Sequence, residues 1–318
     1  MKENEDYFSN QKIVKLTSRI SPEEFESITV KIDSIDPDYF YWNDQQKGRE
    51  FLGIGRLFEL QEADSRFHQI IERLSLKSIS LENENMIFTP AILHYRKFPN
   101  RQKEDLWKDY KNENWFIPKI ILTRNNDSYF ISINVWEKEA EGKDQQSLTE
   151  AVKNELISGS SDNRGIPNIE SIKRYPEFDE WDSLLNRALK EISINKFSKV
   201  VLSRFCDLSF SSIPNLSNLI FKLKKQNSSS IVFVLKESDS VFLGATPERL
   251  LEINNGVLRT EAVAGTIGRG SSENEDKILE QNLLNSAKDR DEQNQVLRFL
   301  LEEIESYSNK AEYDSSPK

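Results

Sequence analysis

The sequence is poor in cysteine and histidine. Its 318 residues contain one cysteine, Cys206, and two histidines, His68 and His94. A single cysteine cannot form a disulfide within the chain, and these residues cannot supply a zinc site of cysteine and histidine ligands. A catalytic metal ion in this protein would therefore have to be held by carboxylates.

Long apolar segments are also lacking. No apolar run approaches the ~18–20 residues that a membrane-spanning helix needs. The first residues, MKENEDYFSNQK, are charged and polar and contain no signal-peptide core. We therefore expect a cytoplasmic protein that has no membrane partner.

Positive charge is in deficit. The chain has 43 Lys and Arg against 53 Asp and Glu, a net charge of −10. This is the wrong sign for binding a phosphate backbone, so nucleic acid is not an expected partner. Hydrophobic residues make up only 37% of the chain, but 18 Phe, 9 Tyr and 5 Trp lie in apolar clusters. These clusters exclude disorder of the whole chain.

Short apolar segments broken by polar turns fill the region from Tyr39 to about Trp136. They are YFYW, FLGIGRLFEL, MIFTPAILHY, FIPKIILT and YFISINVW. The last two flank Asn125-Asn126-Asp127, which favours a hairpin turn because Asn and Asp tolerate positive φ. The pattern predicts an N-terminal region, residues 1–150, made mainly of antiparallel sheet.

A second region, residues 151–318, alternates predicted helices and strands. The boundary is placed between residues 140 and 170, where charged and Gly/Ser/Asn-rich stretches follow one another. Helical spacing of apolar residues predicts helices over 147–157 and 178–194, and at LSNLIFKLKKQ; SIVFVLKE is a predicted strand. A further strand, Lys196 to Asp207, has apolar residues on both faces and is predicted to be central and buried. Periodicity alone allows either an α+β or an α/β arrangement here.

Asn255-Gly256 predicts a tight hairpin, because a type I′ turn needs positive φ at both central positions. Counting outward from this turn sets Glu252 opposite Arg259. The same count sets Glu248 opposite Val263.

This register brings the Glu248 carboxyl beside Ala264-Gly265-Thr266. The backbone N–H groups of these small residues and the Thr266 hydroxyl can receive a carboxylate ligand. An ordinary hairpin followed by a glycine-rich loop fits the same spacing. The glycines fit neither the dinucleotide-binding nor the P-loop pattern.

Two further residues are candidates. Lys199 begins the apolar run KVVLSR, and a lysine with a pKa lowered by burial can act as a general base; the commoner role is a strand-end lysine that reaches water. Glu292 lies at the edge of a helical apolar face, beside Val296, where a carboxylate needs a cation and Mg²⁺ would suit oxygen ligands. The alternative is an exposed glutamate on a helix surface.

Four segments together resemble a known family. They are KVVLSR at 199–204, FLGATPERLL at 242–251, TEAVAGT at 260–266 and AKDRDEQNQV at 287–296. Their order is that of the chorismate-utilising enzymes, which include the isochorismate, salicylate, anthranilate and aminodeoxychorismate synthases. The resemblance implies an α+β fold like that of anthranilate synthase component I, with antiparallel sheets flanked by helices.

Transferred position by position, the resemblance implies chorismate as the substrate and Mg²⁺ as the cofactor. Lys199 would be the general base that activates water, and Glu248 the general acid at the leaving hydroxyl. Gly265 and Thr266 would hold a substrate carboxylate, and Glu292 would bind Mg²⁺.

The resemblance is greatest to isochorismate synthase, an isomerase that adds water at C2 of chorismate with loss of the 4-hydroxyl. Lysine occupies the base position in the water-using branch, whereas ammonia-using anthranilate synthases usually lack it. Ala264 stands where aminodeoxychorismate synthases usually carry a lysine. An anthranilate- or salicylate-synthase type of chorismate enzyme is the alternative. The sequence does not distinguish menaquinone, siderophore and salicylate pathways, and it does not predict the oligomeric state.

The family pattern is incomplete at the C-terminus. Family members normally continue for roughly another third, which includes a second magnesium-binding glutamate, and Gln293 replaces a common histidine. A folded remnant without catalysis is therefore a competing hypothesis. We expect the 318-residue chain by itself to be poorly soluble or self-associating, and inactive.

Overall fold

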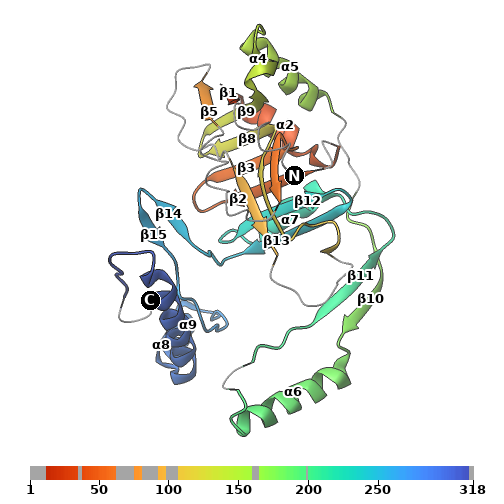
Figure 1. Ribbon diagram of the computed structural model, residues 1–318. Coiled ribbons are helices and arrows are strands. Elements are labelled where there is room, and N and C mark those ends of the chain that lie inside the picture. Colours follow the sequence, from red (N-terminus) through yellow and green to blue (C-terminus); the bar gives the residue numbers. More distant parts are fainter. Residues whose placement is uncertain are drawn as a thin grey trace, which may run out of the picture. The chain divides into compact units, whose positions relative to one another are not determined.

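The computed structural model describes residues 12–34, 38–61, 75–80, 92–97, 107–159, 165–197 and 200–314. The chain divides into two compact units, Met1–Ala245 and Thr246–Lys318. Figure 1 shows their elements. This division differs from the predicted boundary between residues 140 and 170, because a strand from the second region pairs with the N-terminal sheet.

An eight-stranded sheet, in the order β13-β12-β2-β3-β8-β9-β1-β5, dominates the described part of the first unit. In chain order its strands are β1 (Lys12–Arg19), β2 (Tyr39–Asp44), β3 (Arg49–Ile54), β5 (Ser75–Ser80), β8 (Ile120–Asn125), β9 (Ser128–Trp136), β12 (Ile231–Glu237) and β13 (Ser240–Thr246). The pairs from β12 to β1 are antiparallel, whereas β1 and β5 are parallel. The predicted antiparallel layer is therefore confirmed, and β12 pairs with β2 across the predicted boundary.

The hairpin turn predicted around Asn126 is confirmed. Asn125 pairs with Ser128, and Asn126 has a φ of 53°. Strand β1 was not predicted, because charged residues interrupt the apolar pattern of KIVKLTSR. In the folded chain β1 is buried on both faces from Ile13 to Thr17.

Helices and smaller sheets complete the described part of this unit. The helices are α2 (Pro22–Thr29), η1 (Ile32–Ser34), α4 (Glu137–Ala140), α5 (Gln145–Ser158), α6 (Phe178–Ser193) and α7 (Leu216–Gln226). Strands β4 (Phe58–Gln61), β7 (Glu113–Ile117) and β6 (Leu93–Arg96) form one small sheet, and β10 (Ile169–Tyr175) and β11 (Phe205–Phe210) another. Helices α5, α6 and α7 and strand β12 confirm the corresponding predictions. No helix of the described chain is long and apolar enough to cross a membrane.

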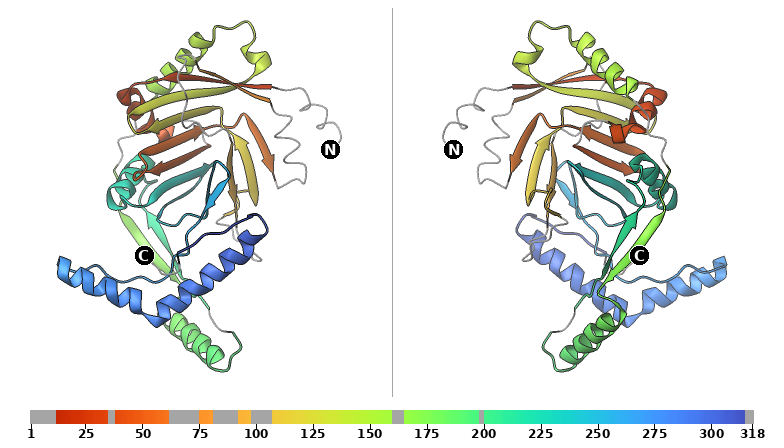
Figure 2. Two further views of the ribbon diagram at one scale, coloured as in Figure 1. Left: turned by 90° about the vertical axis from the view of Figure 1, so that its left-hand side faces the viewer. Right: turned by 90° about the vertical axis from the view of Figure 1, so that its right-hand side faces the viewer.

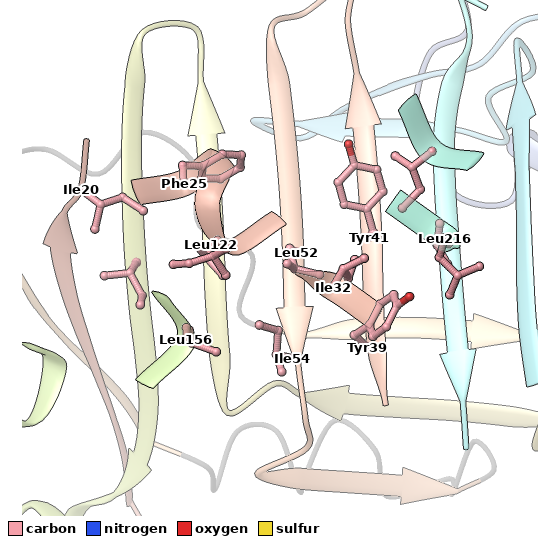
Figure 3. Close-up of a cluster of buried hydrophobic side chains, with 14 of the residues drawn as sticks. Ile20, Phe25, Ile32, Tyr39, Tyr41, Leu52, Ile54, Leu122, Leu156 and Leu216 are labelled. Atoms are coloured by element: carbon pink, nitrogen blue, oxygen red, sulfur yellow. The ribbon is translucent and has the colours of Figure 1, made fainter. Parts of the chain in front are cut away.

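The main core lies between one face of the large sheet and helices α2, α5 and α7 (Figure 3). The sheet contributes Tyr41, Leu52, Leu122 and Val232, and the helices contribute Phe25, Ile28, Leu156, Leu216 and Ile220. The Asp33 carboxylate accepts hydrogen bonds from the backbone N–H groups of Leu216 and Ser217. A negative charge at this helix N-terminus stabilises α7 in its position against the sheet.

A chain of ion pairs joins the large sheet to the small one. Arg56, between β3 and β4, pairs with Glu237 at the end of β12 and with Glu59 of β4. The guanidinium carbon of Arg56 lies 4.5 Å from the centre of the Phe116 ring. Lys111 Nζ reaches the same Glu59 carboxylate at 2.6 Å, so the charges of this partly buried group are paired.

The prediction that Lys196 to Asp207 forms a central buried strand is wrong. Residues 200–204 are not in a strand, and β11 begins only at Phe205. Within the described residues β11 pairs with β10 alone, and all its residues are exposed except the half-buried Phe210. A strand with apolar residues on both faces is buried only where other elements cover both faces. In the described residues β11 has β10 beside it, but no element that covers its faces.

The second unit contains the hairpin β14 (Glu252–Asn254) and β15 (Val257–Arg259), and the helices α8 (Glu273–Asn285) and α9 (Ala287–Glu305). Figure 2 shows the two helices following one another in the chain. Ser286 separates them and is the N-cap of α9, where its hydroxyl accepts a hydrogen bond from the N–H of Asp289 at 3.3 Å. The sequence did not predict α8.

We predict different costs for two identical leucine substitutions in the first unit. Leu52→Ala should lower the free energy of unfolding by about 2–5 kcal/mol, because Leu52 is 0% exposed and its removal leaves a cavity. Leu189→Ala, at a position 56% exposed on α6, should change it by less than about 0.5 kcal/mol. Urea unfolding followed by tryptophan fluorescence measures both. Equal costs would contradict this description of the core.

We also predict a rise in stability above pH 8 that depends on Lys15. Burial lowers the pKa of Lys15 to about 8, below the ordinary lysine value of the unfolded chain. Between these two values the unfolded chain binds more protons, so the free energy of unfolding should increase with pH. Lys15→Met removes this contribution, and its stability advantage over the original chain should shrink between pH 7.5 and 9.5. Parallel pH profiles for the two proteins would refute the prediction.

Candidate functional site

The hairpin predicted at Asn255-Gly256 is confirmed. Asn255 has a φ of 49° and Gly256 a φ of 75°, as a type I′ turn requires. Glu252 pairs with Arg259 in the predicted register. The hairpin therefore reverses the chain between the FLGATPERLL and TEAVAGT segments.

The predicted pairing of Glu248 with Val263 is wrong. The strands extend only to Glu252 and Arg259. Beyond them the Thr260 hydroxyl donates a hydrogen bond to the Leu250 carbonyl at 2.7 Å. This side chain therefore occupies a backbone carbonyl that longer paired strands could use. Glu248 is exposed, and its described hydrogen bonds are local: its backbone N–H and C=O both bond to the Thr246 hydroxyl.

The TEAVAGT segment packs against the first turns of α9. Gly265 has a φ of +82°, and a Cβ placed on it would lie 3.0 Å from Cβ and 3.1 Å from Oδ1 of Asp289. Three residues earlier, the Ala262 carbonyl accepts a hydrogen bond from Gln293 Nε2 at 3.4 Å. Two features of this position therefore favour glycine: the positive φ of the backbone and the close approach of α9.

These contacts place Glu292 at the same part of α9. Asp289 and Gln293 are four residues apart on a helix, so they share the face that meets TEAVAGT, and Glu292 lies three residues from Asp289 on the adjoining flank. Glu292 is half-buried, as predicted for the edge of the apolar face. Gly265 is also half-buried, and Thr266 is exposed.

The structure thus brings together the segments that carry Gly265, Thr266 and Glu292, but it does not bring Glu248 into the predicted pairing. Lys199 lies outside the described residues. Sequence reasoning missed Asp289, whose side chain touches the position that a Gly265 side chain would occupy. The glycine in the motif was a signal for a close neighbour, but the sequence did not identify that neighbour.

The loop after the motif is held by a second acidic residue that was not predicted. Asp276 of α8 pairs with the Arg269 guanidinium and accepts a hydrogen bond from the Gly270 N–H at 2.8 Å. The hydrogen bond from Arg269 is the main cause that lowers the pKa of Asp276. The Asp276 carboxylate therefore stays ionised and anchors the loop to α8.

The carboxylate oxygens of Glu292 are of the kind that a hard cation prefers, but few such ligands lie together among the described residues. No group of three or more His, Cys, Asp or Glu side chains in the described ranges is arranged to hold a metal ion. Mg²⁺ keeps several waters and is commonly bound through one or two carboxylates and the substrate. Glu292 therefore fits Mg²⁺ in its chemistry as one such ligand.

We predict that Gly265→Ala weakens the packing of TEAVAGT on α9. The added methyl group would need a left-handed backbone and would lie within 3.2 Å of Asp289 Cβ, Cγ and Oδ1. Hydrogen exchange of the amides in residues 287–296 should be at least about tenfold faster than in the original chain, a loss of ~1.4 kcal/mol. Gly268→Ala is the control, because a Cβ there meets nothing within 4 Å. Unchanged exchange in Gly265→Ala would show that the contact does not hold the segment.

Comparison with known proteins identifies the family. A family model described as chorismate binding enzyme matches residues 2–318. Isochorismate synthase MenF of Bacillus subtilis is 23% identical over an aligned length of 321 residues. The match covers 92% of this chain and 67% of the relative. The salicylate biosynthesis isochorismate synthase of Pseudomonas aeruginosa is 27% identical over 303 residues, which cover 90% and 63% of the two chains.

Solved structures agree on the fold. The structure of MenF, the menaquinone-specific isochorismate synthase from Escherichia coli, matches with a TM-score of 0.71 at 19% identity. The match covers 96% of this chain and 68% of the other, so the chain spans about two thirds of the length of its relatives. The predicted α+β architecture of antiparallel sheets with helices is confirmed, and the chain belongs to the chorismate-binding enzyme family.

Proposed function

We propose that this chain carries the larger part of an isochorismate synthase, which converts chorismate to isochorismate with Mg²⁺. The observation that carries the proposal is the packing of TEAVAGT on the first turns of α9, with Gly265 against Asp289. Two of the segments that resemble the family's motifs therefore lie side by side. The names of relatives in Bacillus subtilis and Pseudomonas aeruginosa support the choice of reaction.

The reaction needs a base and an acid on opposite faces of the substrate ring. Water is a poor nucleophile, so a neutral amine must take its proton as it adds at C2; we assign this to Lys199. Hydroxide is a poor leaving group, so a protonated carboxyl must donate to the 4-hydroxyl as it departs; we assign this to Glu248. One water enters and one water leaves, so the reaction is a net isomerisation.

Binding the substrate is a problem of charge. Chorismate carries two carboxylates, and the chain has a net charge of −10. Local donors must therefore offset the repulsion. The backbone N–H groups at Gly265 and Thr266, with the Thr266 hydroxyl, would receive one carboxylate. Mg²⁺ held by Glu292 would neutralise the other.

The side chain at position 264 argues against a reaction of the aminodeoxychorismate-synthase type. Ala264 offers no amine to the ring, whereas aminodeoxychorismate synthases usually carry a lysine at this position. The names of the relatives include both menaquinone and salicylate biosynthesis. The proposal concerns the isochorismate-forming step that those names share.

The proposal is tested in an extended protein, in which the unmatched remainder of Bacillus subtilis MenF follows residue 318. This protein should convert chorismate to isochorismate in the presence of Mg²⁺. Lys199→Ala should lower the rate by ~10²–10⁴-fold and leave chorismate binding largely intact, because only the general base is lost. Chromatography of the product and calorimetric titration of chorismate measure the two effects.

Lys196→Ala is the matched control, since Lys196 is exposed and pairs with Glu191 on the surface. Its rate should remain close to that of the unsubstituted extended protein. Near-full activity of Lys199→Ala would remove Lys199 from the mechanism. Absence of isochorismate from the unsubstituted extended protein would count against the proposed function itself.

A further prediction concerns the choice between water and ammonia as the nucleophile. With ammonium added to the same assay, the extended protein should still form isochorismate and no anthranilate, because Lys199 is assigned to activate water. Mass spectrometry of the products decides this. An aminated main product would move the chain to the anthranilate branch.

A further inference from the structure

An open groove lies along the side of helix α7 that faces away from the main core. Leu216 and Ile220 turn toward the core (Figure 3), so residues about half a turn away on the helix line the groove. Its volume of about 720 Å³ is in the range of small-molecule sites. The chain at Gly165 and Ile166, before β10, completes the described lining. Both segments belong to the first unit.

The groove carries positive charge. Lys222 and Lys225 line it, and both side chains are exposed. Lys224 pairs with Glu50, whereas neither groove lysine forms an ion pair with a described residue. No Asp or Glu is among the described lining residues, and α7 contains no acidic residue. In a chain of net charge −10, this local positive charge favours an anionic ligand.

The groove also has apolar walls that suit a ring. Phe221 is 65% exposed and lines the groove, as does Ile166. A Cβ placed on Gly165 would meet nothing within 4 Å, so this residue leaves the space beside it open. Aromatic side chains bind other rings by stacking or by edge contacts. A ligand that carries a ring would therefore cover Phe221, which a simple inorganic anion would leave exposed.

The spacing of the two lysines indicates where the negative charges of the ligand lie. Residues three apart on a helix have Cβ atoms roughly 5–6 Å apart. Carboxylates at positions 1 and 3 of a six-membered ring have a similar separation. Such a ligand could place one carboxylate at Lys222 and the other at Lys225 while its ring rests on Phe221.

We propose that this groove is a binding site for a six-membered ring compound that carries two carboxylates. It is separate from the proposed chorismate contacts, because Gly265 and Glu292 belong to the second unit and α7 to the first. The ligand would stabilise α7 from the side opposite the core. The inference goes beyond the proposed reaction and does not depend on it.

Isophthalate, benzene-1,3-dicarboxylate, is the probe, because it has the ring and both carboxylates and cannot undergo the proposed reaction. Ligand-observed NMR measures its binding to the 318-residue chain. Isophthalamide is the uncharged analogue, and inorganic phosphate is an anion without a ring. We expect isophthalate to bind at least about tenfold more tightly than either. Adding NaCl to about 0.5 M should weaken its binding, because the two lysines are exposed and salt screens their charges.

Matched lysine variants locate the site. Lys222→Gln with Lys225→Gln should weaken isophthalate binding at least about tenfold, and glutamine keeps the helix because it is a good helix former. Lys138→Gln with Lys143→Gln is the control, since both lysines are exposed and lie outside the groove and the net charge changes equally. Its affinity should be unchanged. Circular dichroism and the unfolding midpoint check that the two variants are equally folded.

A second pair of variants tests the ring contact. Phe221→Ala should weaken isophthalate binding about threefold or more, because the stacking surface is lost. Phe178→Ala removes a phenylalanine of similar exposure, 70%, from α6 and should leave the affinity unchanged.

Three outcomes would overturn the proposal. The first is the absence of isophthalate binding to the unsubstituted chain. The second is equal affinity of the two lysine variants, which would place the ligand elsewhere. The third is binding of phosphate as tight as that of isophthalate, which would mean that the groove does not select a ring. Isochorismate formation is not measured in any of these experiments, so their failure is distinguishable from failure of the proposed reaction.

Discussion

The proposed function depends on the close approach of the TEAVAGT segment to helix α9. At Gly265 the backbone has a positive φ and lies so near Asp289 that a methyl group would be in contact at 3.0 Å. The hydrogen bond from Gln293 to the Ala262 carbonyl holds the same segment three residues earlier. Glu292 lies between these two anchors in the sequence of α9. The proposed carboxylate-binding backbone and the proposed metal-binding carboxylate would therefore act together only while this contact holds.

The sequence predicted those parts of the site whose geometry is local. Asn255-Gly256 specifies its own turn, and the pairing of Glu252 with Arg259 follows by counting from it. Helical periodicity likewise placed Glu292 at the edge of an apolar face. The same count failed further out, where it set Glu248 opposite Val263, because the Thr260 hydroxyl bonds to the Leu250 carbonyl beyond the end of the hairpin. The partner of Gly265 was a matter of tertiary packing and had no local signal.

The fold shows the same limit. The helices α5, α6 and α7 follow from apolar spacing within each segment, whereas the pairing of β12 with β2 joins residues almost two hundred positions apart. That pairing places the unit boundary after Ala245. The Lys196 to Asp207 run was predicted as a buried strand from its apolar residues, but burial depends on what lies beside a strand. In the described chain only β10 lies beside β11.

We propose that chorismate binds where TEAVAGT meets α9. A crystal structure of the extended protein with chorismate and Mg²⁺ tests it most directly. We expect one chorismate carboxylate at the backbone N–H groups of Gly265 and Thr266, and Mg²⁺ at the Glu292 carboxylate. Chorismate bound away from both Gly265 and Glu292 would contradict it.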